Sequence, residues 1–296
     1  MNSRSSRLRT LGLVVALITL HTVSQARAVN CLSPNADSTS ELVRPWRLAA
    51  VGGSTLTAFV VGHGFLNDLW WKGEKVPFHF NWQQDGEYAI GADKLGHQYM
   101  AFATTRVYDA AFRWCGLDST TAVFAGAGVS VAYQTYIEVR DGFSRDYGFS
   151  WGDFIANTTG AALPVVQRFV PALRPLDLQI SFSPSDAFNR GEFGAIIDDY
   201  TSTTHWVSVG VFEYLPSTWQ EWYPPWLNLA VGHSVTNLDG QGGGTHVLYV
   251  SLDWNLAAIK GLPTWLREGL QLLHLYHLPA PAVRITPTVA FFGLKF

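Results

Sequence analysis

The chain has 296 residues, of which 48% are hydrophobic and 15% are charged, and its formal net charge is -3. That length allows one large domain or two smaller ones, and the hydrophobic share is enough to bury a core, so a disordered chain is excluded. The first 28 residues hold four of the 20 Lys and Arg and none of the 23 Asp and Glu, so the remainder is more acidic still. Nucleic acid is therefore not an expected partner.

The first 28 residues have the form of a signal peptide. Three arginines precede an apolar run from Leu11 to Leu20, and a small-x-small site for a leader peptidase ends at Ala28. The run is only about half the length of roughly twenty residues that a membrane-spanning helix needs. We expect residues 1–28 to be removed on export and residues 29–46 to form a polar lead-in.

Two cysteines remain after that cleavage, and they leave two alternatives open. Cys31 could pair with Cys115 in an oxidising periplasm, although two cysteines do not make a disulfide framework. Cys31 also lies close enough to the leader to carry a lipid anchor. The residues just before it, Ala28-Val29-Asn30, lack the small residue expected immediately ahead of a lipidated cysteine.

Residues 47–175 are expected to form a helical domain. The stretch from Arg47 to Leu66 is apolar and contains Gly and Thr, so it could cross a bilayer or form a buried helix. Residues 67–92 are rich in aromatic side chains with polar tips, which favours a membrane interface or a cap over a core. Three further helical patterns follow, over residues 93–114, 119–139 and 150–169, and small residues at 125–128 would let another helix approach closely.

Polar side chains recur at helical spacing in these three segments. Members of each pair are three or four residues apart and would share a helix face, or flank a helix end: Asp93 and His97, Glu138 and Asp141, Asp153 and Asn157. No cofactor motif is evident, but converging side chains of these types could hold a divalent metal. The candidate ligands are Asp93, His97, Glu138 and Asp153. The candidates for acid/base catalysis are His97, Glu138 and Asp153.

A structural interpretation of the same residues stays open beside the functional one. Asp93 would cap its helix, Asp141 would lie in a turn, and Asn157 could bridge helices inside an apolar bundle. Buried polar networks of this kind can fix one packing arrangement without chemistry. The sequence contains no Ser nucleophile motif, phosphate loop or Cys/His metal cluster.

After Pro175 the apolar residues alternate with polar ones, which is typical of half-buried antiparallel strands. We expect about five strands in residues 176–296, packed on the helical domain, with one inserted helix over residues 262–275, so the fold class is α+β. His274 and His277 near the end of that helix are too few to make a metal site. The last strand ends at Phe296, as bacterial outer-membrane proteins usually do, but the strands are too few and too short to close a spanning barrel.

Three motifs carry a resemblance to a known family. DKLGH, IEVRDGFS and GFSWGDFIAN resemble the YfiM-like predicted periplasmic lipoproteins, a domain of unknown function, over about Trp70 to Gln167. A weaker similarity to VanZ-like membrane proteins rests on the same order of helices. VanZ-like proteins are polytopic in the inner membrane, whereas this chain has a leader and a strand-rich second half. The resemblance implies the matched positions Asp93, Lys94, His97, Glu138, Asp141, Asp153 and Asn157, and no settled chemistry.

Together these features predict an exported protein of the Gram-negative cell envelope, located in the outer membrane or periplasm. We expect it to associate with a membrane and to contact lipid or an envelope protein, with a buried polar network that is structural or binds a ligand. The alternative is a metal- or acid/base-assisted hydrolase of an envelope lipid or glycan, in which Lys94 or Arg140 holds an anionic group.

Overall fold

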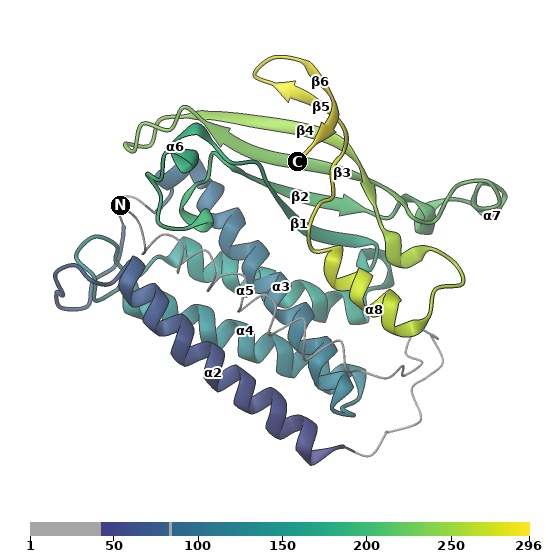
Figure 1. The fold of residues 1–296 in the computed structure, drawn as a ribbon, viewed down its shortest axis with the longest axis horizontal. Helices are drawn as coiled ribbons and strands as arrows, with labels where there is room; N and C mark the ends of the chain where they lie inside the picture. The colour runs from purple at the N-terminus through teal and green to yellow at the C-terminus, as the bar shows by residue number, and fades with distance from the viewer. Residues whose placement is uncertain (1–42, 83–84) are drawn as a thin grey trace.

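The computed structural model describes residues 43–82 and 85–296. The predicted signal peptide, most of the lead-in and Cys31 lie outside these residues. Four long helices come first, and an antiparallel sheet with short inserted helices follows, which confirms the α+β class (Figure 1). The helices are α2 (Pro45–Leu69), α3 (Ala92–Trp114), α4 (Ser119–Asp141) and α5 (Trp151–Phe169).

The helix ends follow from local side-chain chemistry. Asp118 caps α4 by accepting hydrogen bonds from the Thr120 and Thr121 amides, and Ser150 caps α5 through the Asp153 amide. The expectation that Asp93 is an N-cap was wrong. Gly91, with φ at 83°, begins α3 instead, so Asp93 falls inside the first turn and its carboxylate is directed to other partners.

Glycines bring α3, α4 and α5 close together. A Cβ on Gly126 of α4 would lie 2.9 Å from the backbone oxygen of Thr105 in α3. A Cβ on Gly160 of α5 would clash with the backbone of Gln98, also in α3. Gly128, two residues beyond Gly126, faces open space. Only part of the small-residue stretch predicted at 125–128 therefore serves the helix contact.

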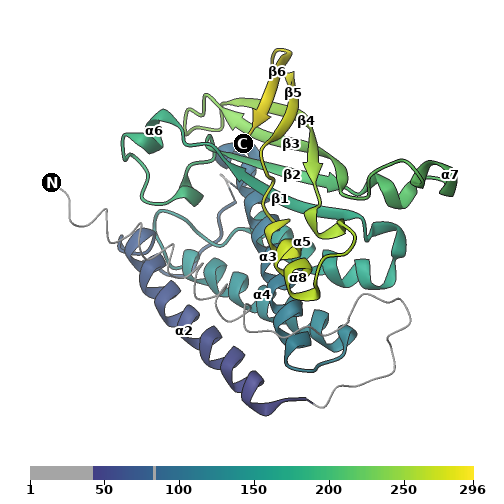
Figure 2. The same ribbon diagram turned by 45° about the vertical axis from the view of Figure 1, so that its right-hand side comes forward.

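Helix α2 is largely exposed along its length. Its inner side touches α4 through aromatic contacts, such as Phe59 against Tyr136, and Tyr108 of α3 donates a hydrogen bond to Thr55. Among the described residues, α2 is the one helix long and apolar enough to cross a membrane. In Figures 1 and 2 it lies on the opposite side of the bundle from the sheet.

Six strands pair in chain order, each antiparallel to its neighbour. They are β1 (Leu176–Phe182), β2 (Thr203–Val209), β3 (Leu227–Thr236), β4 (Thr245–Trp254), β5 (Ala280–Thr286) and β6 (Ala290–Lys295). The predicted single last strand is two strands, because Pro287 has no backbone N–H to continue the ladder. The inserted helix is α8 (Thr264–Leu273), between β4 and β5.

The remaining elements are short and lie in the connections. They are η1 (Tyr88–Gly91), η2 (Pro171–Leu173), α6 (Asp186–Asn189), η3 (Ile196–Asp198), η4 (Val211–Tyr214), α7 (Ser217–Gln220) and η5 (Leu256–Ala258).

The alternation predicted for the strands is present, and the buried side holds many polar residues beside an apolar cluster of Trp206, Ala230, Val247 and Tyr249. Gln179, Ser208 and Asp253 are fully enclosed, together with His274 and His277 from the segment after α8. The His277 ring stacks on Trp206, with the ring centroids 4.0 Å apart, and its Nδ1 lies 3.4 Å from Asp253. The two histidines thus belong to the interior of the curled sheet.

Candidate functional site

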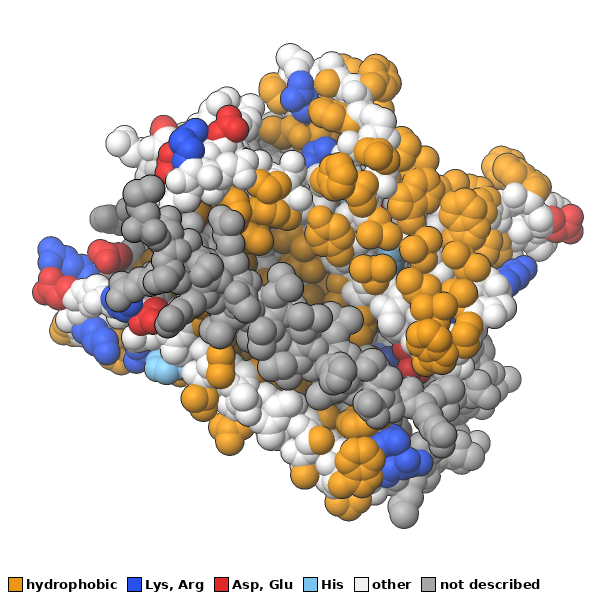
Figure 3. All heavy atoms as spheres, viewed as in Figure 1, with side chains coloured by type: hydrophobic (Ala, Val, Ile, Leu, Met, Phe, Trp, Pro, Cys, Tyr) orange, Lys and Arg blue, Asp and Glu red, His pale blue; other side chains and the backbone are white. Residues whose placement is uncertain are grey.

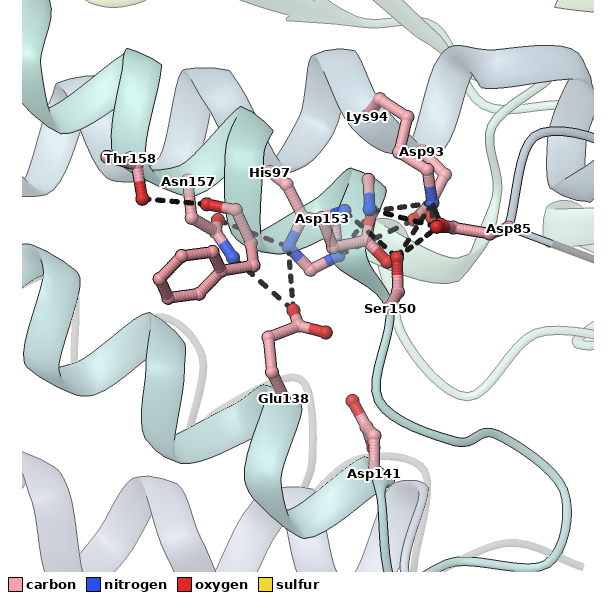
Figure 4. A network of polar contacts seen from close by, with 12 residues as sticks. Asp85, Asp93, Lys94, His97, Glu138, Asp141, Ser150, Asp153, Asn157 and Thr158 are labelled. Atoms are coloured by element: carbon pink, nitrogen blue, oxygen red, sulfur yellow. Dashed lines mark hydrogen bonds and ion pairs between the residues drawn. The ribbon is translucent and has the colours of Figure 1, made fainter. Parts of the chain in front are cut away.

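Six of the seven predicted residues converge where α3, α4 and α5 meet, and the seventh, Asp141, lies near them at the end of α4 (Figure 4). Helix α3 supplies Asp93, Lys94 and His97, α4 supplies Glu138 and Asp141, and α5 supplies Asp153 and Asn157. We refer to these seven residues as the polar cluster. Asp93 and Asp153 lie in the first turns of their helices, where the helix dipole favours a negative charge.

His97 occupies the centre of the polar cluster. Its Nδ1 lies 3.2 Å from Asn157 Oδ1 and 3.5 Å from Glu138 Oε1. Its Nε2 faces the other way, 3.6 Å from Asp93 Oδ1 and 3.8 Å from Asp153 Oδ1. The Asn157 amide also donates to Glu138 at 3.3 Å. One imidazole therefore connects side chains from all three helices.

Lys94 neutralises the other end of the polar cluster. Its Nζ pairs with three carboxylates, at 3.0 Å from Asp85, 3.1 Å from Asp93 and 2.7 Å from Asp153. Asp141 lies apart from this group, because its carboxylate accepts a hydrogen bond of 2.6 Å from the Trp71 indole.

Two residues that sequence reasoning missed complete the surroundings. Asp85 pairs with Lys94 and accepts hydrogen bonds from the Ser150 hydroxyl and from the Gly152 amide, the latter at 2.9 Å. Tyr200, in the connection between β1 and β2, donates to Asp93 Oδ1 at 2.6 Å. Both lie outside helices and strands, so no periodicity places them; the one signal is that Asp85-Gly86 has the form of a turn.

Protonation differs among the carboxylates because their surroundings differ. Burial raises the pKa of Glu138 to about 9, and repulsion from Asp153 and Asp141 adds to this shift. Burial also raises the pKa of Asp141 to about 7, against the hydrogen bond from Trp71. Glu138 is therefore neutral at pH 7, and Asp141 is about half ionised.

The two aspartates that face His97 Nε2 have pKa values shifted in opposite directions. Burial alone would raise the pKa of Asp93, but attraction to His97 and Lys94 and the hydrogen bond from Tyr200 hold it below the ordinary value. Burial raises the pKa of Asp153, and the attraction of His97 and Lys94 offsets this only in part.

Three of the four predicted metal ligands face one point. One oxygen of Asp93, one of Asp153 and one nitrogen of His97 all lie within 4.8 Å of one another. Ligand atoms around an ion at about 2.1 Å lie roughly 3 Å apart, so small side-chain movements would close this group on a cation. Glu138 contacts the opposite nitrogen of His97 and is not part of this three-atom group. It is placed to orient the imidazole.

Comparison with known families gives one match. Residues 80–168 match the family described as "Predicted periplasmic lipoprotein (DUF2279)". This segment is less than a third of the chain, and it contains the whole polar cluster. The comparison supports the first of the two resemblances noted in the sequence; the similarity to VanZ-like proteins stays a prediction. Searches of curated proteins and of solved structures found no match.

Proposed function

We propose that this chain is a membrane-associated protein of the bacterial cell envelope and that its polar cluster binds a divalent cation. The observation that carries the proposal is the convergence of Asp93, His97 and Asp153, whose ligand atoms lie within 4.8 Å of one another. Carboxylate oxygen with a single imidazole suits a borderline or hard divalent ion such as Mn²⁺ or Mg²⁺.

The charge balance supports a cation as the ligand. Asp93 and Asp153 are both buried, and one ammonium group, that of Lys94, neutralises them together with Asp85. A divalent ion between Asp93 and Asp153 would take over the two contacts that these carboxylates now make with the Lys94 ammonium. Lys94 would then remain paired with Asp85 and the Ser150 hydroxyl, 3.3 Å away.

Three features support the envelope location. The sequence begins with the pattern of an export signal, the matched family is described as periplasmic, and α2 is long and apolar enough to cross a membrane. A lipid on Cys31 would add an anchor on the same membrane. The mass of the purified mature chain distinguishes a lipidated Cys31 from a free one.

The test is a titration of the full mature chain in detergent with Mn²⁺, followed by electron paramagnetic resonance of the free ion. We expect saturable binding of one ion per chain. His97→Ala and Asp153→Asn should each weaken it at least about tenfold, which corresponds to roughly 1.4 kcal/mol. Glu74→Gln, which changes an exposed carboxylate paired with Arg145, should leave it unchanged. Binding that is absent, or equal in all variants, contradicts the cation site.

A second candidate function is acid/base hydrolysis of an envelope lipid or glycan. It is favoured by the two-sided surroundings of His97, with Glu138 3.5 Å from Nδ1 and Asp153 3.8 Å from Nε2. In cells that carry His97→Ala at normal abundance, this function predicts an altered envelope lipid or glycan profile. Loss of the protein itself with an unchanged profile would instead indicate a structural role.

A further inference from the structure

The outward side of the sheet carries an apolar row that crosses all six strands. The pairing register places its members directly opposite one another, one per strand: Leu178, Val207, Val231, Val250, Val283 and Phe291. Four of these side chains are exposed, from Val250 at 38% to Phe291 at 82%, and Leu178 and Val283 are half-buried. Leu229 and Leu248 lie beside the row on the same side of the sheet and are also exposed. We call these eight residues the outer sheet face.

The opposite side of the same strands is enclosed and mixed: it holds buried polar side chains together with the apolar cluster of Trp206, Ala230, Val247 and Tyr249. The neighbouring register row begins with Asp177, Ser208, Ala230 and Ser251, of which the last three are almost completely buried. A water-soluble antiparallel sheet places its apolar side against the core and its polar side toward solvent. Here both sides carry apolar residues: those of the inner side are enclosed, whereas those of the outer sheet face are exposed, as expected for strands whose outward side meets lipid.

The outer sheet face carries no formal charge, and aromatic residues border it. Along β4, exposed apolar side chains begin at Leu248, and the strand ends six residues later at Trp254, about 20 Å away. Trp226 contacts Trp254 at this end, and Trp219, Trp222 and Trp265 of the adjoining segments are exposed. Figure 3 shows hydrophobic side chains gathered over α7, α8 and the β5–β6 hairpin. Tryptophan side chains favour the boundary between lipid headgroups and hydrocarbon.

The other end of the face is polar. His233 and His246, on β3 and β4, contact each other through their ring nitrogens at 2.9 Å, and the hairpin that follows β3 contains Asp239, Gln241 and three consecutive glycines. The outer sheet face is thus apolar over about 20 Å along β4, with tryptophans at one end and polar groups at the other, the order of chemical groups found from the interior of a lipid leaflet to its border.

We propose that the outer sheet face contacts the hydrocarbon of a lipid bilayer. This inference rests on the membrane association in the proposed function and names the surface that provides it. A second protein copy would cover one side of the molecule, whereas exposed apolar side chains lie both on the sheet and on α2, which are on opposite sides of the bundle. Lipid can cover both.

The experiment uses fluorescent probes at single cysteines in the full chain with Cys31→Ala and Cys115→Ala. Probes are attached at Val231→Cys and Val250→Cys, with Gln241→Cys in the polar hairpin as the matched control. The protein is reconstituted in vesicles of phosphatidylethanolamine and phosphatidylglycerol. We expect spin labels on the lipid acyl chains to quench the probes at 231 and 250 several-fold more than the probe at 241, and iodide to quench in the opposite order.

Two results would overturn the proposal. If iodide reaches position 231 in vesicles that retain the protein, the sheet faces water and α2 alone provides the contact. If position 231 is shielded from both iodide and acyl-chain labels, a protein covers the face. These readouts are independent of Mn²⁺ binding, so failure of the cation site and failure of this surface are distinguishable.

A second pair of variants serves if the cysteine-free chain does not fold. In a chain that also carries Leu56→Glu and Val60→Glu, so that α2 no longer dominates retention, Val231→Asp should lower the vesicle-bound fraction several-fold in flotation, because it places a charge in hydrocarbon. Gln241→Asp should leave the bound fraction unchanged. Equal flotation of the two variants would contradict lipid contact at the outer sheet face.

Discussion

Individual side chains in the polar cluster differ in charge because each has a different set of neighbours. Asp93 is stabilised as a carboxylate by Lys94, His97 and Tyr200, whereas Glu138 is enclosed among acids and holds its proton. A neutral Glu138 can donate or accept a hydrogen bond at His97 without adding a negative charge to the polar cluster. Its protonation therefore limits the repulsion that the buried carboxylates would otherwise exert on one another.

The raised pKa of Glu138 predicts a pH-dependent stability. Between the ordinary pKa of 4.5 and about 9, the folded chain keeps a proton that the unfolded chain releases. The free energy of unfolding should therefore fall as pH rises through this window, by about 1.4 kcal/mol per pH unit, and show no further change from this group above it. Glu138→Gln should remove that slope when unfolding in urea is measured across the window.

Asp141 provides the matched control, because its window is different. Its pKa rises from 3.8 to about 7, so Asp141→Asn should flatten the profile only below about pH 7. If the free energy of unfolding changes with pH in the same way for the natural chain and for Glu138→Gln, then Glu138 ionises normally.

Replacement of Lys94 tests whether its ammonium holds the position that a cation would take. Lys94→Met leaves Asp85, Asp93 and Asp153 without their shared cation, which should lower stability by about 3 kcal/mol in the presence of a chelator. Mn²⁺ should restore much of this loss and bind more tightly than to the natural chain. Thermal unfolding with and without Mn²⁺ measures both effects. If Lys94→Met is equally unstable with and without Mn²⁺, the Lys94 ammonium and the ion do not compete for the same carboxylates.

At the scale of elements, the polar cluster depends on how closely three helices approach. Gly126 and Gly160 allow backbone contact with α3, and the distances between Asp93, His97 and Asp153 follow from that spacing. A methyl group on either glycine would push its helix away from α3, and this would move the three side chains apart. The glycines therefore determine the geometry of a site to which they contribute no polar atom.

Two alanine substitutions in α4 test this dependence. Gly126→Ala places its Cβ 2.9 Å from backbone atoms of Thr105 and Asp109, which cannot move independently of α3, and should cost about 1–3 kcal/mol. Gly128→Ala meets no atom within 4 Å and should be neutral or stabilise by up to about 1 kcal/mol through helix propensity. Urea unfolding compares the two. Equal effects would show that α4 does not depend on the close contact.

For the whole molecule, the apolar surface of α2 predicts how the protein is retained in cells. Leu56 and Val60 are among its most exposed side chains, at 65% and 60%. The mature chain should stay in the membrane pellet in high salt and enter the supernatant in detergent. Leu56→Glu with Val60→Glu should increase the salt-released fraction several-fold without unfolding the bundle, because neither side chain is buried. Release of the natural chain by salt alone would contradict membrane embedding.

The sequence predicted the helices better than the surfaces. The boundaries of α3, α4 and α5 agree with expectation within one or two residues, because the apolar period, Ser119 at the start of one segment and the capping residue Ser150 are local signals. Six residues of the polar cluster were predicted from helical spacing, which determines which side chains share a face, and Lys94 was named only through the family resemblance. Asp85 and Tyr200 were not predicted, because they reach the polar cluster from segments without a period.

The polarity of the sheet could not be predicted from alternation. Alternation shows that the two sides of a strand differ, but not which side is enclosed; that depends on how the sheet curls and on what covers each side. Here the segment with His274 and His277 covers the inner side of the sheet, where polar residues and the Trp206 cluster lie, an arrangement that brings together residues far apart in sequence.

The hydrogen bond from Tyr200 to Asp93 joins the two halves of the molecule at the polar cluster. Tyr200 belongs to the connection between β1 and β2, so its position follows the sheet, while Asp93 belongs to α3. An ion on Asp93 would compete for electron density on the oxygen that accepts the hydrogen bond from Tyr200, so the two contacts would affect each other's strength. If the proposed ion binds, its occupancy and the position of this connection would form a thermodynamic cycle, in which each alters the other by the same factor. If the sheet is held in lipid, a change in its position would alter the hydrogen bond of the Tyr200 hydroxyl and thereby the affinity of the site between the helices.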